Sequence, residues 1–148
     1  MKQLLLVLLI LPALTFAQAN APKQPTGATY DAKILRVTDG DTVVIAATYL
    51  LKPLKPELAV RIYGVDTPEK GYLAKCPAEK NMGEIASLFT KAVVAASTQR
   101  QVTLYGWDKY GGRVLGDIIL DGKSLRQALI AKGYAREYYG TAKQSWCN

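Results

Sequence analysis

The sequence contains no histidine, and cysteine, methionine, tryptophan and phenylalanine occur only twice each. Without histidine, the Ser-His and Cys-His pairs that activate nucleophiles in many hydrolases are excluded. A structural zinc site normally takes four cysteine or histidine ligands, so two cysteines argue against one here. The sequence shows no internal repeat and no second domain, and its 148 residues fit one domain with a single core.

A long apolar run is missing as well. A membrane-spanning helix needs about 20 apolar residues, whereas the run over residues 4–11 ends at Pro12. Lys2 precedes this run and the small residues Ala17 and Ala19 follow it, which is the layout of a secretory signal peptide. We therefore expect cleavage after Ala19 and export of a bacterial protein to the periplasm or the medium, with no stable membrane association afterwards.

The chain divides into a signal peptide at residues 1–19, a polar, proline-containing lead-in at residues 20–30 that we expect to be disordered, and one domain at residues 31–148. Within the domain, alternating apolar residues bounded by turn residues predict five strands. The predicted strands cover residues 33–37, 42–46, 59–65, 101–107 and 113–120. A helical period predicts a long amphipathic helix at residues 77–97 and a short one at residues 124–132. This pattern, with about three helices in all, predicts an α+β fold built on a small closed five-stranded β-barrel of the OB-fold type.

The charged residues are unbalanced, with 19 Lys and Arg against 12 Asp and Glu and a formal net charge of +7. Loss of the signal peptide would lower this charge by one unit, because Lys2 is its only charged residue. A basic exported domain favours an anionic partner, such as nucleic acid, acidic polysaccharide or a membrane surface. The alternative is that the positive charge only keeps the protein soluble.

Cys76 and Cys147 are the two cysteines. In an exported chain, an even number of cysteines makes a disulfide the default expectation. Such a bond would close a loop of about 70 residues and, in the chain-entropy model, stabilise the fold by roughly 4 kcal/mol. It would also fasten the C-terminal residues to the body of the domain.

Three aspartates lie at the ends of predicted strands. Asp39 and Asp41 flank a glycine at a predicted hairpin turn, and Asp66 ends the third strand. Asp-Gly-Asp alone is typical of an ordinary turn. Carboxylates from two adjacent strands, together with a carbonyl such as that of Thr67, are however the hard oxygen ligands that Ca²⁺ or Mg²⁺ prefers. We hypothesise a cation site made by Asp41, Asp66 and Thr67, with positions left for water and a phosphate oxygen.

Two arginines and a glutamate complete a set of groups suited to phosphodiester hydrolysis. Arg61 lies in the third predicted strand, Arg113 begins the fifth, and Glu69 follows Pro68. Taken singly, each is equally well a solvated surface residue. Together, two guanidinium groups can bind a phosphate bidentately and stabilise the charge that grows on it, while Glu69 can accept a proton from the attacking water.

Several tyrosines and a lysine are candidates for substrate contacts. The tyrosines can stack on the bases of single-stranded nucleic acid, although most tyrosines in such a domain are simply part-buried. These candidates are Tyr110, Tyr134, Tyr138 and Tyr139. Lys109 can bind a phosphate or be an ordinary solvated charge, and we include it among the substrate-binding candidates.

Three segments, taken in order, resemble the thermonuclease family, the staphylococcal-nuclease-like calcium-dependent nucleases. They are Asp39-Gly40-Asp41-Thr42, then Arg61 with Asp66-Thr67-Pro68-Glu69, and finally Asp108-Lys109-Tyr110-Gly111-Gly112-Arg113. The likeness runs from about residue 32 to residue 139, nearly the whole expected domain. It implies an OB-fold barrel with helices, and hydrolysis of DNA and RNA to products that end in 3′-phosphates.

The resemblance also assigns roles to matching positions. The implied calcium ligands are Asp41, Asp66 and the carbonyl of Thr67. The implied catalytic residues are Glu69, as general base or as the group that orients the water, and Arg61 and Arg113, which would bind the phosphate and stabilise its transition state. The implied nucleotide contacts are Tyr110 and Tyr139.

Two features depart from the family pattern. Gly111-Gly112 puts one residue more before Arg113 than the best-known members have, and the connection over residues 49–58 is longer. The sequence as a whole predicts a monomeric, exported, calcium-dependent nuclease. Two alternatives remain: the same fold used as a non-catalytic module that binds single-stranded nucleic acid, and a structural or cell-surface interaction domain.

Overall fold

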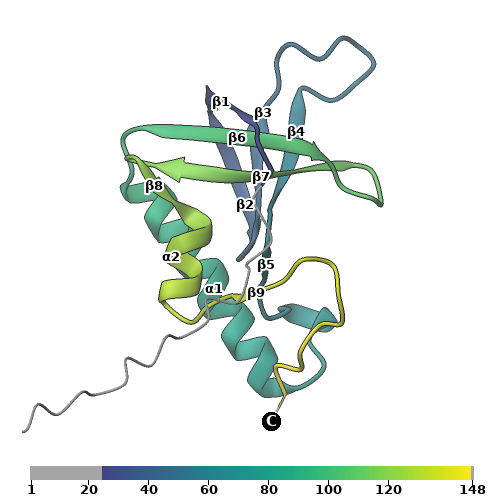
Figure 1. The fold of residues 1–148 in the computed structure, drawn as a ribbon, viewed down its shortest axis with the longest axis vertical. Helices are drawn as coiled ribbons and strands as arrows, with labels where there is room; N and C mark the ends of the chain where they lie inside the picture. The colour runs from purple at the N-terminus through teal and green to yellow at the C-terminus, as the bar shows by residue number, and fades with distance from the viewer. Residues whose placement is uncertain (1–24, 148) are drawn as a thin grey trace, which may run out of the picture.

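The computed structural model describes residues 25–147 (Figure 1). The signal peptide expected at residues 1–19 lies outside these residues. In the described part the chain forms nine strands, two α-helices and one short 3₁₀ helix, so the predicted mixed α+β class is confirmed. In the same part of the chain, no helix is long and apolar enough to cross a bilayer.

Seven of the strands form one sheet, in which β6 and β7 cross the direction of β2, β3 and β4 (Figure 1). The order is β1-β6-β7-β4-β3-β2, with β8 paired to β7. The strands of this sheet are β1 (Ala28–Asp31), β2 (Ile34–Asp39), β3 (Thr42–Ala46), β4 (Glu57–Ile62), β6 (Arg100–Trp107), β7 (Arg113–Leu120) and β8 (Lys123–Ser124). β4 and β7 run parallel, and the other pairs are antiparallel. The two remaining strands, β5 (Val65–Asp66) and β9 (Arg136–Glu137), pair with each other.

The predicted strands are present, but the closed barrel is not. Within the described residues β1 and β2 are the two edges of the sheet, and they do not pair with each other. The third predicted strand is divided into β4 and β5, and the short strands β1, β8 and β9 are additional. Residues 28–30, expected in a disordered lead-in, belong to β1 and are ordered by antiparallel pairing with β6.

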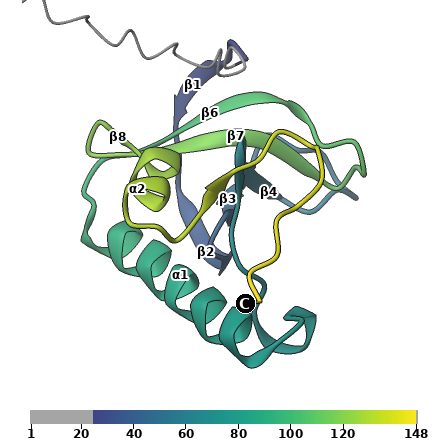
Figure 2. The same cartoon turned by 60° about the horizontal axis from the view of Figure 1, so that its bottom comes forward.

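Helix α1 (Pro77–Ala96) covers the core where the sheet stays open. It packs beside β2 and runs beneath the end of that strand (Figure 2). Ala86 and Val94 of α1 are buried, and so are Leu125 and Leu129 of the shorter helix α2 (Leu125–Ala131). The third helical element, η1, is a single 3₁₀ turn (Gly71–Leu73). The strand residues of the same core are Val43, Ile45, Val60, Ile62, Val65, Val102, Ile118 and Leu120.

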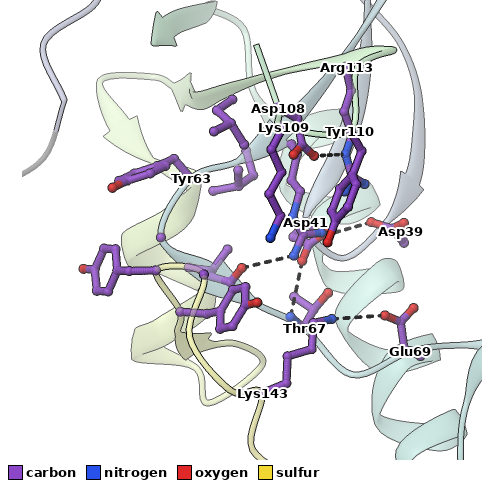
Figure 3. A pocket seen from close by; sticks show the side chains of 18 of the residues that line it. Asp39, Asp41, Tyr63, Thr67, Glu69, Asp108, Lys109, Tyr110, Arg113 and Lys143 are labelled. Carbon is purple, nitrogen blue, oxygen red and sulfur yellow. Dashed lines mark hydrogen bonds and ion pairs between the residues drawn. The ribbon is translucent and has the colours of Figure 1, made fainter. Parts of the chain in front are cut away.

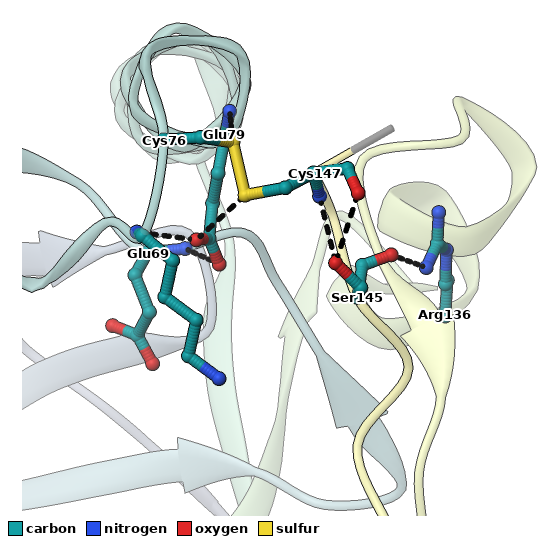
Figure 4. Close-up of a disulfide and its surroundings, with 7 residues drawn as sticks. Glu69, Cys76, Glu79, Arg136, Ser145 and Cys147 are labelled. Atoms are coloured by element: carbon teal, nitrogen blue, oxygen red, sulfur yellow. Dashed lines mark hydrogen bonds between the residues drawn. A yellow bond between two sulfur atoms is a disulfide. The ribbon is translucent and has the colours of Figure 1, made fainter.

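The disulfide expected between Cys76 and Cys147 is present, with Cα atoms 6.0 Å apart. Cys76 is also the N-cap of α1, where its side chain accepts a hydrogen bond from the backbone N–H of Glu79. The bond therefore attaches the end of the described chain to the first turn of its longest helix (Figure 4).

Candidate active site

An open cavity of about 650 Å³ lies between the β2–β3 turn, the β6–β7 turn and the segment after β9 (Figure 3). It collects nearly all residues that the sequence suggested for the site. Those lining it are Asp41, Arg61, Thr67, Glu69, Lys109, Tyr110, Arg113 and Tyr139. Asp66 is not among the lining residues, and it is only 5% exposed. The cavity thus unites side chains that lie far apart in the sequence.

Asp41 is held in place by the packing of its turn against helix α1. Gly40 is buried, and a Cβ atom at this position would lie 2.9 Å from the Cβ of Ala86 and 3.0 Å from Cγ2 of Thr67. The hydroxyl of Thr90 donates a hydrogen bond to the carbonyl of Gly40 at 2.7 Å. Glycine lets the turn approach the helix this closely, so the Asp-Gly-Asp sequence fixes the position of Asp41 as well as the turn.

Arg61 links two carboxylates of the site. Its Nη1 donates to Oδ1 of Asp41 at 2.7 Å, and its Nη2 lies 4.0 Å from Oδ1 of Asp66. Nη2 also donates to the carbonyl of Val65 at 3.3 Å. The other oxygen of Asp41 accepts a hydrogen bond from the backbone N–H of Thr67 at 3.3 Å. The carboxylates of Asp41 and Asp66 therefore approach the same guanidinium group.

Both carboxylate oxygens of Asp66 are approached by the C-terminal segment. Nε1 of Trp146 donates to Oδ2 at 3.1 Å, and Nζ of Lys143 lies 2.6 Å from Oδ1. The second contact is close but poorly aligned, because Oδ1 accepts no well-formed hydrogen bond among the described residues. Burial lowers the pKa of Lys143, but the carboxylates of Asp66 and Glu69 outweigh this effect and raise the pKa above its ordinary value. Lys143 is therefore an ammonium ion facing a buried carboxylate.

Glu69 stands at the edge of the cavity, with its side chain 42% exposed. Its backbone N–H donates at 3.4 Å to the buried carboxylate of Glu79 in α1 (Figure 4). At Gly83 in the same helix, a Cβ atom would lie 2.4 Å from the carbonyl oxygen of Glu69. The backbone of Glu69 is thus fixed against α1, while its carboxylate stays accessible.

Arg113, the first residue of β7, is oriented by Asp108 across the β6–β7 turn. Its Nε donates to Oδ2 of Asp108 at 2.5 Å. Asp108 is buried, whereas the side chain of Arg113 is about one-third exposed. Among the described residues, Nη1 and Nη2 of Arg113 have no hydrogen-bond partner, so both remain available to an anion in the cavity.

The candidate nucleotide contacts differ in their surroundings. Tyr110 is 78% exposed at the β6–β7 turn, and Nζ of Lys109 lies 4.9 Å from the centre of its ring. Tyr139 is held more firmly, because its hydroxyl accepts a hydrogen bond from Arg126 at 2.7 Å and its ring is tilted against that of Tyr63. Exposure therefore favours Tyr110 over Tyr139 as a surface on which a base can stack.

Asp39 adds another carboxylate beside Asp41, whose backbone N–H donates to Oδ1 of Asp39 at 3.2 Å. Burial first, and the negative charge of Asp41 second, raise the pKa of Asp39 from 3.8 to about 6. Burial is thus the main cause of the raised pKa of Asp39, and the like charge of Asp41 adds to it. Asp39 and Asp41 together form an acidic end of the cavity.

A family model described as staphylococcal nuclease homologue matches residues 59–146, which is more than half of the chain. The chain belongs to this family. The matched range of the nuclease homologue contains Arg61, Asp66, Glu69 and Arg113. It begins after the first hairpin, so Asp41 is tied to the site by its contacts with Arg61 and Thr67 rather than by the match.

The sequence did not reveal three residues that shape the site of this nuclease homologue. Glu79 fixes the backbone of Glu69, and Trp146 and Lys143 approach Asp66. No local motif marks any of the three. The expected disulfide was the one available signal, because it brings the residues before Cys147 close to the start of α1.

The oxygen atoms around Arg61 fit a hard cation. Carboxylate oxygens are among the ligands that Ca²⁺ takes, and those of Asp41 and Asp66 approach the same guanidinium group, while the backbone N–H of Thr67 contacts Asp41. The buried Oδ1 of Asp66 lacks a well-formed hydrogen bond among the described residues. The ammonium group of Lys143 lies 2.6 Å from this oxygen, so a positive charge of the chain already occupies the place that a metal ion would take.

Proposed function

We propose that this protein is an exported, calcium-dependent nuclease that hydrolyses phosphodiester bonds of DNA and RNA and leaves 3′-phosphate ends. Its family supports the reaction class. The observation that carries the proposal is the presence of Arg61, Glu69 and Arg113 in one open cavity. Two guanidinium groups and an accessible carboxylate, supplied by separate elements, are suited to metal-assisted attack of water on a phosphate.

The calcium ligands in this proposal are Asp41, Asp66 and the carbonyl of Thr67. When bound, calcium would supply positive charge beside the scissile phosphate. The approach of Asp41 and Asp66 to one guanidinium group supports this ligand set. Calcium takes about 6–8 oxygen ligands, so water and a phosphate oxygen would complete the set.

Glu69 would act on the attacking water. Its accessible carboxylate can accept a proton while the water oxygen attacks phosphorus, and its backbone is steadied by Glu79. The bond between phosphorus and O5′ then breaks, the phosphate stays on the 3′ side, and the O5′ alkoxide takes a proton from solvent. General-base catalysis contributes about 10²–10⁴ in rate. The larger part of the acceleration must therefore come from electrostatic stabilisation.

Arg113 and Arg61 would stabilise the charge that develops on the phosphate. Arg113 presents Nη1 and Nη2 to the cavity while Asp108 holds its Nε, and Arg61 lines the same cavity beside Asp41. A guanidinium group fixed before the reaction needs little reorganisation in the transition state. At the cavity edge, exposed Tyr110 and Lys109 would contact the nucleotide.

Export as a monomer is part of the proposal. The disulfide between Cys76 and Cys147 supports an oxidising compartment, the periplasm or the medium. The signal peptide at residues 1–19 stays a prediction. N-terminal sequencing of the protein recovered from periplasm and medium tests it, and the expected first residue is Asn20.

The activity is tested by incubating purified protein with DNA and with RNA, first in calcium and then with a chelator. Cleavage that requires calcium and yields 3′-phosphate ends supports the proposal. Binding without cleavage under both conditions would indicate the alternative, a non-catalytic module for single-stranded nucleic acid. End-group analysis of the products separates 3′-phosphate from 5′-phosphate chemistry.

A further inference from the structure

The segment after β9 passes the acidic end of the cavity before it reaches the disulfide (Figures 3 and 4). Lys143 lines the cavity, and Cys147 is bonded to Cys76 shortly after it. The disulfide therefore keeps Lys143 close to Glu69, although 74 positions separate them in the sequence.

The ammonium group of Lys143 occupies the space between two acidic residues of the site. Its Nζ lies 2.6 Å from Oδ1 of Asp66 and 3.4 Å from Oε1 of Glu69. The same Oδ1 lies 4.0 Å from the guanidinium group of Arg61. The carboxylate that would bind a metal ion thus already faces two cations of the chain itself.

This ion pair is asymmetric, which separates it from an ordinary surface pair. The side chain of Asp66 is almost fully buried, whereas that of Lys143 is 44% exposed. A buried carboxylate is poorly screened from its partner, but a long, half-exposed lysine can swing into solvent. Lys143 is therefore able to leave the site, while Asp66 is not.

We propose that Lys143 is the resident counter-cation of the acidic site and that a divalent ion binds there only by displacing its ammonium group from Asp66. Lys143 has this role only if Asp66 is a metal ligand, so the proposal rests on the proposed function. A ligand that needs a less populated state of the site binds with an apparent affinity lowered by that population. Lys143 thereby sets the calcium concentration at which the site fills.

Calcium titration by calorimetry, without nucleic acid, tests the role of Lys143 independently of activity. Lys143→Gln removes the competing charge and should bind calcium at least about fivefold more tightly than the unaltered protein, the lower end of typical coupling between sites. Lys143→Arg keeps the positive charge, so its calcium affinity should stay much closer to that of the unaltered protein. Lys70→Gln is the matched control: Lys70 follows Glu69 in sequence, but its Nζ contacts the hydroxyl of Ser87 at 3.2 Å.

The outcomes separate the two proposals. A tighter calcium site in Lys143→Gln, without a comparable gain in Lys70→Gln, supports the role of Lys143. Equal affinities of the unaltered protein and Lys143→Gln would overturn that role and leave the calcium site standing. An equal gain in Lys143→Arg would also overturn it, because the charge would then not be the cause. Absence of calcium binding in both the unaltered protein and Lys143→Gln would overturn the metal site itself, and with it the role of Lys143.

Discussion

The buried carboxylate of Glu79 accepts a hydrogen bond from the backbone N–H of Glu69 at 3.4 Å, and this contact ties the proposed general base to helix α1. The second oxygen of Glu79 accepts from the backbone N–H of Lys75 at 2.7 Å. One glutamate thus holds the segment between the active-site loop and the helix at two points. Because Cys76 caps the same helix, the disulfide and the segment that carries Glu69 are both attached to the start of α1.

Glu69→Gln should lower kcat by about 10²–10⁴, the usual contribution of a general base. The fold should be unchanged, because the contact with Glu79 uses the backbone of Glu69 and the side chain is half exposed. The measurement is kcat at saturating DNA, together with a thermal melt. Glu84→Gln, on an exposed position of α1, is the control for loss of one negative charge. Full activity in Glu69→Gln would remove Glu69 from the mechanism.

Arg113→Ala should lower kcat by about 10²–10³, the range found when one preorganised donor to a developing charge is removed. Asp108→Asn should have a smaller effect, since it weakens the bond that orients Arg113 but keeps the guanidinium group. Steady-state kinetics of the two variants, measured side by side, show which of them loses more kcat. A larger loss in Asp108→Asn than in Arg113→Ala would contradict an orienting role for Asp108.

The sequence predicted the main strands and helices because each of them has a regular apolar period and clear turn residues at its ends. It did not predict the open sheet. All four residues of β1 (Ala28–Asp31) are exposed, so this edge strand is ordered by its pairing with β6 and not by a buried apolar face. Closure of a barrel depends on whether the two edge strands meet, and here α1 packs beside β2 instead.

The grouping of the candidate residues was predictable where it rests on local motifs and not where it rests on distant contacts. Arg61, Glu69 and Arg113 stand in recognisable segments, and the cavity brings them together. Trp146 donates a hydrogen bond to Asp66, which lies 80 positions earlier in the sequence, and no pattern in either segment predicts this contact. Such a hydrogen bond follows from the course of the whole chain, which local periodicity does not specify.

Reduction of the disulfide should lower the melting temperature. The bond between Cys76 and Cys147 spans 71 positions, and a loop of this length corresponds to roughly 4 kcal/mol in the chain-entropy model. Calorimetric melts with and without a phosphine reductant, after a count of free thiols, measure the effect. The double variant Cys76→Ala with Cys147→Ala should melt at one temperature in both buffers. Identical melts of the unaltered protein in both buffers would show that the bond does not stabilise the fold.

Trp146→Phe should destabilise the fold although Trp146 lies close to the end of the chain. The indole N–H is the hydrogen-bond donor to Oδ2 of Asp66, and both residues are buried. Phenylalanine keeps an apolar ring but leaves this acceptor unpaired, which costs about 1–3 kcal/mol. Urea unfolding followed by circular dichroism measures the difference. Trp107→Phe is the matched control, because Trp107 is 69% exposed and should change stability by less than about 0.5 kcal/mol. Equal stability of the two variants would mean that the end of the chain does not support Asp66.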